Sequence, residues 1–341
     1  MTEVALQSGA DPLAQARLHA LLRFGAGVTG GFVLAEAMGW LPTFIVPLLT
    51  GVLLANLPFS PPLKVGILLA GVMTVSALFA FVLSSYLVGS PFILYGCVGI
   101  VIFAALYTMA KGLAALPMTL MLLCVATIPV VTLVIPDYAD LLPTAMARGM
   151  VVAVLIVWLV FAMWPQVTPP ASKPPAHPLG SPLRVALTGA AIVMPLLLVY
   201  LAFGITDALP VLVTTLLLVA TFDVSQGAVQ GLVMVLGNLL GGFVGLIAFL
   251  IVGVAPSLFV LALVTFVIAI VAAEYISRGG AAGALALLTC NSALIIFSIA
   301  LANPDSSAGI WFTRLFQFCL AWIFAVGMMW LLMPRRSSAG G

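Results

Sequence analysis

The apolar pattern of this chain occurs twice in the same direction, and the two copies lie about 165 residues apart. Lys111 in the first copy corresponds to Arg278 in the second, 167 positions later. Arg148 corresponds to Arg314, 166 positions later, and each of these arginines lies near the start of the last apolar segment of its half. An internal repeat of this length predicts a fold of two similar halves. In membrane transporters, such repeats typically enclose the binding site between them.

Charged residues are too rare here for a soluble protein. They make up 6% of the 341 residues and hydrophobic residues make up 64%, whereas a typical soluble domain is about 25% charged. No soluble core could bury that much apolar surface, so we expect most of the chain to lie in membrane lipid. The net charge of +2 and the lack of any long basic stretch argue against a nucleic-acid partner.

Twelve apolar segments can be distinguished, six in each half, and they predict an all-α integral membrane protein with about 12 transmembrane helices. Residues 1–165 form the first six-helix repeat and residues 182–341 the second, joined by a proline-rich cytoplasmic linker over residues 166–181. The predicted segments are 21–40, 41–57, 63–88, 91–110, 113–135, 144–165, 182–206, 208–222, 227–252, 255–276, 280–302 and 308–333.

The basic residues predict how these segments are oriented. With the N-terminus in the cytoplasm, nine lysines and arginines fall on the inner side and two on the outer side, in agreement with the positive-inside rule. An even number of spans in each half makes the two repeats parallel and places both termini in the cytoplasm. The inner residues are Arg17, Arg23, Lys64, Lys111, Lys173, Arg184, Arg278, Arg335 and Arg336, and the outer residues are Arg148 and Arg314.

Arg148 and Arg314 are candidate anion-binding residues because they are the two exceptions to the charge rule and occupy matching positions. A guanidinium group within the membrane costs roughly 2.5–3.5 kcal/mol, so its presence requires a reason. A functional reason is a paired site for a carboxylate, which the planar guanidinium fits well. The alternatives are contact with outer lipid headgroups, or structural ion pairs with Asp137, Asp140 or Asp305.

Glu36 is a candidate proton carrier, because it lies in the outer third of the first span and has no acidic counterpart in the second half. Burial of a carboxyl group raises its pKa and suits it to proton transfer. The alternatives are an ion pair with an outer arginine and a simple interfacial position.

The second and eighth segments are both short and contain proline. Such a pair in corresponding places indicates a transport site between the halves. Thr50 in the second segment, Thr214 in the eighth and Asn291 near the middle of the eleventh are therefore candidate substrate-binding residues. Two ordinary explanations compete with this one: proline is common in the first turn of a helix, and polar side chains often only hold helices together.

Other patterns predict structure more than chemistry. Glu274 and Arg278 have the spacing of a local ion pair on one helix. Glycines at 237, 241 and 245, and at 27 and 31, form G-x-x-x-G frames that predict close helix packing, within one chain or between copies. The four cysteines lie in apolar segments without metal-ligand spacing, so we expect no metal, no cofactor and no catalytic site.

Three features together resemble the fusaric acid resistance and aromatic acid exporter family, in its short bacterial members without a soluble domain. These features are the six-span repeat, an arginine shortly before the first span of each half (Arg17 or Arg23, and Arg184), and the small-residue sequence GNLLGGFVG over residues 237–245. The resemblance implies a bacterial inner-membrane export component for aromatic or other weak organic acids. Family members often work with a periplasmic adaptor protein.

The expected function is therefore proton-coupled export of an organic anion by a multi-pass inner-membrane protein. A second copy of the chain, in a homo-oligomer, is one of the partners to consider. Two other classes remain open. One is a membrane subunit that assembles partner proteins without transporting anything. The other is an integral-membrane enzyme for lipid-linked substrates, which would need clustered acidic, histidine or lysine side chains at one membrane face.

Overall fold

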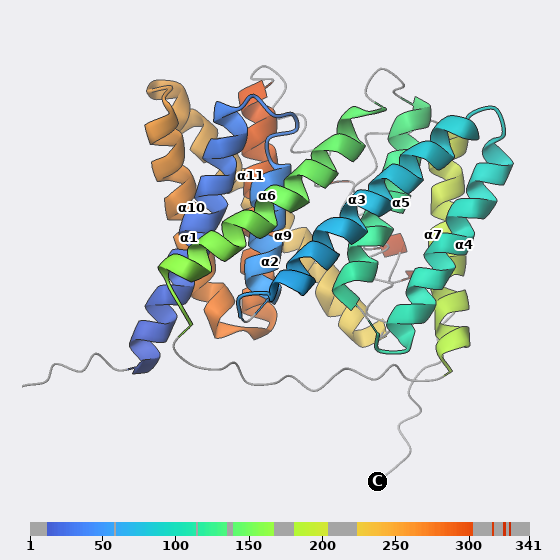
Figure 1. The fold of residues 1–341 in the computed structure, drawn as a ribbon, viewed down its shortest axis with the longest axis horizontal. Coiled ribbons are helices and arrows are strands. Elements are labelled where there is room, and N and C mark those ends of the chain that lie inside the picture. Colours follow the sequence, from blue (N-terminus) through green and yellow to red (C-terminus); the bar gives the residue numbers. More distant parts are fainter. Residues whose placement is uncertain are drawn as a thin grey trace, which may run out of the picture.

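The computed structural model describes residues 12–57, 59–113, 115–134, 139–166, 181–203 and 224–302, with the isolated positions 316, 323, 324, 327 and 328. Helices account for nearly all of these ranges, and no strand occurs in them (Figure 1). The helices are α1 (Pro12–Ala37), α2 (Ile45–Asn56), α3 (Leu63–Tyr86), α4 (Pro91–Ala110), α5 (Ala115–Val134), α6 (Leu141–Met163), α7 (Pro182–Phe203), α9 (Val224–Val254), α10 (Leu258–Arg278) and α11 (Gly280–Ala302).

Nine helices in the described ranges are long and apolar enough to cross a membrane. Only α2 is shorter: its 12 residues rise about 18 Å, against a hydrocarbon thickness of about 30 Å. The prediction of an all-helical integral membrane protein is therefore confirmed for the described residues. The eighth predicted segment, with Thr214, lies outside them, as does the linker apart from its ends. The twelfth, with Arg314, lies outside them except for the five isolated positions.

Two helix boundaries differ from the prediction for local reasons. α1 begins at Pro12 rather than near residue 21, because proline suits the first turn of a helix and the polar residues that follow have partners on neighbouring helices. α2 begins at Ile45 rather than near residue 41. The chain turns at Gly39, which has a φ of 62°, and Pro42 disfavours helical backbone at the residue before it.

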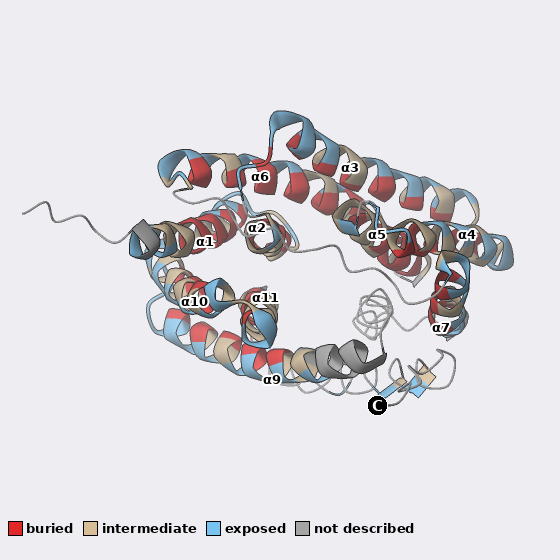
Figure 2. Ribbon diagram, turned by 90° about the horizontal axis from the view of Figure 1, so that it is seen from below, coloured by how far each residue is buried: buried red, intermediate tan, exposed pale blue. Residues whose placement is uncertain are grey.

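The buried side chains form two separate hydrophobic clusters that do not follow the order of the chain. We call the cluster built from α2, α3, α4, α5, α6 and α7 the first cluster. The second cluster is built from α1, α9, α10 and α11. Thus α1 packs against α10, and α7 packs against α4. Figure 2 shows the resulting arrangement, with α3 and α6 along one long side, α9 along the other, and α2 and α11 between them.

Glycines allow the closest helix contacts in the second cluster. A Cβ atom at Gly241 would lie 2.4 Å from the carbonyl oxygen of Thr289, and one at Gly245 would lie 2.6 Å from that of Ala293. The backbones of α9 and α11 therefore touch where any larger residue would collide. On the other side of the molecule, Gly31 of α1 faces Pro47 of α2 at 3.3 Å. The prediction of close packing is confirmed, and the packing occurs within one chain.

The charged side chains separate the two ends of the bundle. We call the end where α1 begins the near end and the opposite end the far end. Of the basic residues described, six lie at or toward the near end, because they are close to the starts of α1, α3 and α7 or to the ends of α4 and α10: Arg17, Arg23, Lys64, Lys111, Arg184 and Arg278. Arg148, near the start of α6, lies toward the far end. The described part of the chain therefore has the charge asymmetry that the sequence predicts.

Candidate functional site

The short helix α2 and the residues just before it meet α11 along a contact that we call the α2–α11 seam, with Thr43 and Gly51 on one side and Asn291 and Ser298 on the other. Thr43 Oγ1 and Ser298 Oγ lie 2.5 Å apart, within hydrogen-bonding distance, and both side chains are buried. A Cβ atom at Gly51 would lie 3.7 Å from Asn291 Oδ1. Because α2 belongs to the first cluster and α11 to the second, this seam is a contact between the two clusters.

The amide oxygen of Asn291 is the unusual atom of the seam. It is buried and has no hydrogen-bond partner in the described part of the chain. Leaving a buried polar group unpaired costs about 1–3 kcal/mol, more than the chain would lose by placing an apolar residue there. The hydroxyl of Thr50, the residue before Gly51, does not donate to this amide oxygen, because it donates to the carbonyl oxygen of Val46 at 2.8 Å. The seam therefore holds an acceptor that a bound donor could satisfy.

α2 can be short because protein surrounds it on most sides. Seven of its residues are buried, and it packs against α1, α6 and α11. Broken or shortened backbone at membrane depth is tolerated where protein or water meets it rather than lipid. The predicted importance of this segment thus has a structural basis: α2 is a central helix, enclosed by helices from both clusters.

Arg148 lies at the far end of the seam, on the turn of α6 that packs against the start of α2. The next residue, Gly149, is so close to α2 that a Cβ atom there would lie 2.6 Å from Ile45 Cγ2. The guanidinium carbon of Arg148 lies 4.5 Å from the ring centroid of Trp40, a cation–π contact. Trp40 follows α1, so this contact also joins the first cluster to the second.

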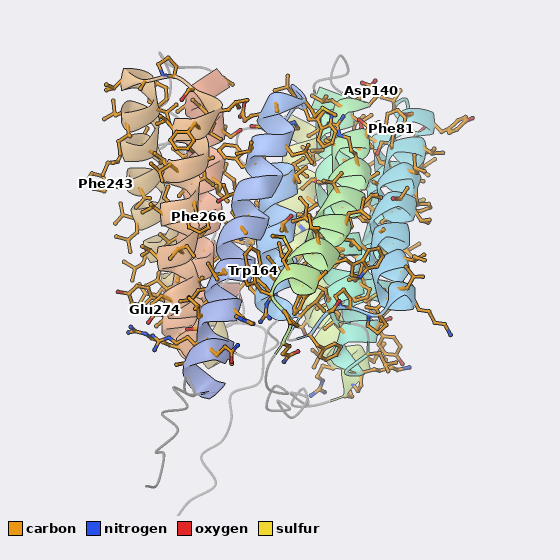
Figure 3. The ribbon with its side chains drawn as sticks, turned by 60° about the vertical axis from the view of Figure 1, so that its left-hand side comes forward. Phe81, Asp140, Trp164, Phe243, Phe266 and Glu274 are labelled. Atoms are coloured by element: carbon orange, nitrogen blue, oxygen red, sulfur yellow. The ribbon has the colours of Figure 1, made fainter. Side chains whose placement is uncertain are left out.

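No carboxylate among the described residues pairs with Arg148. Its side chain is half-buried, and its Nε atom is buried without a hydrogen-bond partner. Asp140, one of the proposed structural partners, precedes α6 at the far end (Figure 3) and forms no ion pair within the described ranges. The other two, Asp137 and Asp305, lie outside these ranges. Within the described ranges, Arg148 is therefore a positive charge beside an aromatic ring and without a carboxylate partner.

Glu36 lies in the last turn of α1, one turn before Trp40, and is half-buried. It forms no ion pair with Arg148 or with any other basic residue that the structure describes. Of the predicted site residues, Asn291 lies at the seam beside Gly51, whereas Thr50 faces α1, with its Cγ2 atom 3.3 Å from where a Cβ atom of Gly27 would lie. Arg148 and Glu36 lie nearer its far end.

Two residues of α1 contact the end of α6, and sequence reasoning assigned them no role. Arg23 Nη1 donates to the carbonyl oxygen of Trp164 at 2.9 Å, and its guanidinium carbon lies 4.5 Å from the ring centroid of Phe161. His19 Nδ1 lies 2.9 Å from the carbonyl oxygen of Pro165, so this nitrogen is the donor. We call this group the near-end clasp. Arg23 is 9% exposed, and its position inside an apolar helix was the available signal.

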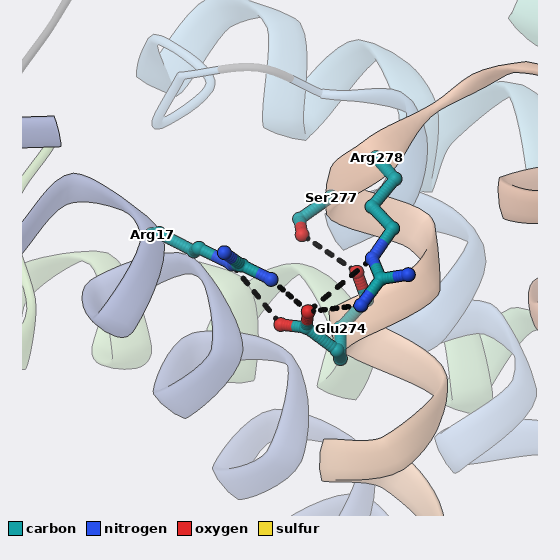
Figure 4. Close-up of polar contacts among 4 residues, drawn as sticks. All are labelled: Arg17, Glu274, Ser277 and Arg278. Carbon is teal, nitrogen blue, oxygen red and sulfur yellow. Dashed lines mark hydrogen bonds and ion pairs between the residues drawn. The ribbon is translucent and has the colours of Figure 1, made fainter. Parts of the chain in front are cut away.

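A second polar group fastens α1 to α10 at the same end (Figure 4). Arg17 forms a two-pronged ion pair with Glu274, in which Nε donates to Oε2 at 3.1 Å and Nη2 donates to Oε1. Arg278 Nη2 also donates to Glu274 Oε1, at 2.9 Å. The predicted pair between Glu274 and Arg278 is confirmed. The contribution of Arg17, 257 positions away in the chain, had no local sequence signal.

The described residues contain no group of three or more histidine, cysteine or acidic side chains that could hold a metal ion. Cys97, Cys124 and Cys290 are free thiols, and Cys319 lies outside the described ranges.

Comparison with known proteins gives one match. Residues 20–160 match a family described as a protein of unknown function (DUF2955). No curated protein and no solved structure matches the chain. The matched range contains most of α1 and α6 and all of α2 to α5, so it coincides closely with the first predicted half.

Proposed function

We propose that this chain is a secondary transporter of the bacterial inner membrane that exports an organic anion, such as an aromatic or other weak acid. The observation that carries this proposal is Arg148, a half-buried arginine without a carboxylate partner in the described ranges. An unpaired guanidinium in a membrane protein is costly unless it serves an anion. Its position over Trp40 adds an aromatic surface beside the charge, which suits a cargo that carries both a carboxylate and a ring.

The proposed architecture is two parallel six-helix repeats, 12 helices in all. Equivalent helices under this repeat make equivalent contacts: α1 packs against α10 as α7 packs against α4, and α3 packs against α5 as α9 packs against α11. The range of the family match, which ends just before the linker, also favours a unit of six helices. Such repeats support alternating access, in which the binding site opens to each side of the membrane in turn.

In this proposal the near end faces the cytoplasm, because six described basic residues lie at or toward it and one toward the far end. Both termini are then cytoplasmic. Cargo would enter from the near end, bind in the α2–α11 seam beside Thr50 and Asn291, and leave at the far end past Arg148. Thr214 and Arg314 would supply the matching groups from the second half. A periplasmic adaptor would receive the cargo in the cell.

Glu36 is the proposed proton carrier. It lies at the far end, from which protons enter a bacterial cell, and no described basic residue neutralises it. Replacing it with glutamine keeps the size and removes the charge. We expect Glu36→Gln to abolish the dependence of export on the proton gradient, measured as efflux from vesicles with and without a protonophore. Export that remains gradient-driven in this variant would remove Glu36 from the coupling.

The direct test is efflux of radiolabelled benzoate and hydroxybenzoates from proteoliposomes that contain only this protein. We expect export by the parent chain, and a loss of roughly tenfold or more in Arg148→Met, because a charge-assisted hydrogen bond contributes about 1.5–3 kcal/mol. Arg278→Met is the matched control, because Arg278 also lies over an aromatic ring, that of Tyr275, but at the opposite end. Equal export by the parent and Arg148→Met would refute an anion role. No export of any probe by the parent would favour a non-transporting subunit.

A further inference from the structure

The near end of α1 is held in two different ways by the two clusters, and this difference has a consequence for gating. Toward α10 and α11, α1 presents Phe24, Val28 and Phe32, all buried in the second cluster. Farther along α1, toward the far end, the rings of Phe32 and Phe297 pack edge to face with centroids 5.4 Å apart. Gly25 lies so close to α10 that a Cβ atom there would lie 2.7 Å from Ile270 Cδ1.

The ion pairs of Arg17 and Arg278 with Glu274 extend this contact beyond the apolar part of α1. A motion that separated α1 from α10 would expose several aromatic and aliphatic side chains and break the ion pair between Arg17 and Glu274. Burial of such side chains is the largest stabilising term in the contact. We therefore expect the near end of α1 to stay on α10 when the contact between α1 and α6 opens.

Toward α6, the near-end contact is of another kind. The clasp consists of His19 and Arg23 donating to the carbonyl oxygens of Pro165 and Trp164, with Arg23 also lying over Phe161. Carbonyl groups at the end of a helix have no partner within the helix, and water satisfies them readily. Opening the clasp would let water donate to these carbonyl groups, which offsets part of the free energy lost with the two protein hydrogen bonds.

We propose that the near-end clasp is the cytoplasmic gate of the transporter: His19 and Arg23 on α1 release the end of α6 to admit cargo to the seam. This inference rests on the proposed function. It predicts that the gate lies between α1 and α6, both in the first half of the sequence, and not between α1 and α10.

Leu54 offers a reporter for this opening. It lies on α2 and contacts both clusters, with its Cδ1 atom 2.7 Å from the Cβ position of Gly27 on α1. Leu54 is partly buried between α1 and the first cluster, so a cysteine at this position is partly shielded while α1 packs against α2. A membrane-impermeant maleimide added to inside-out vesicles should react with it faster when the near end opens. The reaction rate of the new cysteine is the labelling rate of Leu54→Cys minus that of the parent chain, which carries only the natural cysteines.

We expect Arg23→Met, combined with Leu54→Cys, to raise the labelling rate by roughly tenfold or more, because the lost hydrogen bond involves a charged donor. Methionine keeps the apolar contact with Phe161. Arg278→Met, combined with Leu54→Cys, is the control and should change the rate less than twofold, because it affects only the α1–α10 side. An unchanged rate in Arg23→Met, or an equal rise in both variants, would overturn the gate.

If Arg23→Met does not yield a monodisperse protein, His19→Phe tests the same gate through the other donor. We expect a rise of roughly two- to tenfold, in line with the loss of one ordinary hydrogen bond. An unchanged rate would again overturn the proposal. None of these measurements requires cargo, so a failed export assay and a failed labelling assay are distinguishable: the first refutes the transport function and the second refutes the gate.

Discussion

Helix α11 has two faces that differ in kind. Toward α9 it meets glycines, and backbone touches backbone: a Cβ atom at Gly241 would lie 2.4 Å from Thr289 O. Toward α2 it presents the buried, unpaired amide oxygen of Asn291 and the hydroxyl of Ser298. The first face is filled and leaves no room for a larger side chain. The second holds an acceptor that nothing in the described chain satisfies.

This difference distinguishes a contact that stays packed from one that can open during transport. Close-packed interfaces resist motion, because small displacements lose many van der Waals contacts at once. An interface with an unsatisfied polar atom has less to lose when it opens, and gains a hydrogen bond when water or cargo enters. The α9–α11 face therefore holds the second cluster together, and the α2–α11 seam is where the clusters can part.

The largest effect is expected at the close-packed face. Gly241→Ala places a methyl group against the backbone of α11, which cannot give way as a flexible side chain can. Overpacking of this kind costs about 3 kcal/mol or more. We expect a marked fall in thermal stability or in the yield of folded protein in detergent, measured by fluorescence-detected size exclusion after heating.

Gly253→Ala on the same helix is the matched control, because nothing lies within 4 Å of its Cβ position. Alanine there should leave stability unchanged or raise it, since alanine favours helix more than glycine does. Similar melting of both variants would mean that α9 and α11 are not in backbone contact.

A smaller effect on stability, but a clear one on transport, is expected at the seam. Asn291→Leu removes the unpaired amide oxygen and keeps a side chain of similar volume. Stability should stay the same or rise by about 1 kcal/mol, while export of hydroxybenzoate, whose hydroxyl can donate to the amide oxygen, should fall roughly tenfold. Ser292→Ala, next in sequence but directed toward Asn238 of α9, should change export little. A strongly destabilised Asn291→Leu with normal export per folded molecule would assign Asn291 to packing.

The smallest effect is expected at the exposed ion pairs. Glu274→Gln removes the charge that joins Arg17 to Arg278, whose side chains are 52% and 57% exposed. Partly exposed pairs contribute less than about 1 kcal/mol, so the melting temperature should fall only slightly, and less so at high salt. A large loss of stability would show that these ion pairs, rather than the apolar contact, hold α1 on α10.

Local sequence patterns predicted the local features of this molecule. Apolar segments became helices, the glycine frames became close contacts, and Glu274 pairs with Arg278 one turn away. Helices and the pair of Glu274 with Arg278 depend on residues near one another in the chain. Close packing at a glycine depends only on its small size, whichever helix lies beside it. Thr50 and Asn291 were predicted to bind substrate because Thr50 lies in a short segment and Asn291 in a polar part of an apolar one.

The pairing of distant elements could not be predicted in the same way. Nothing local in α1 indicates that it packs with α10 instead of staying with its own half. Thr43 and Ser298 are single hydroxyls in apolar surroundings, and only the antiparallel placement of α2 beside α11 brings them together. Arg23 was assigned to the cytoplasmic surface by its charge, whereas its carbonyl partner on α6 follows from tertiary packing.

The most direct test of the central claim is a disulfide across the seam. In Thr43→Cys/Ser298→Cys the sulfur atoms replace oxygens that lie 2.5 Å apart, close to the S–S length of about 2.05 Å. The control pair, Ile45→Cys/Gly149→Cys, joins α2 to α6 within the first cluster, where the two Cβ positions lie 3.7 Å apart. We predict that oxidation stops export in the seam pair, that reduction restores it, and that the control pair exports in both states. Full export with the seam disulfide formed would contradict the account.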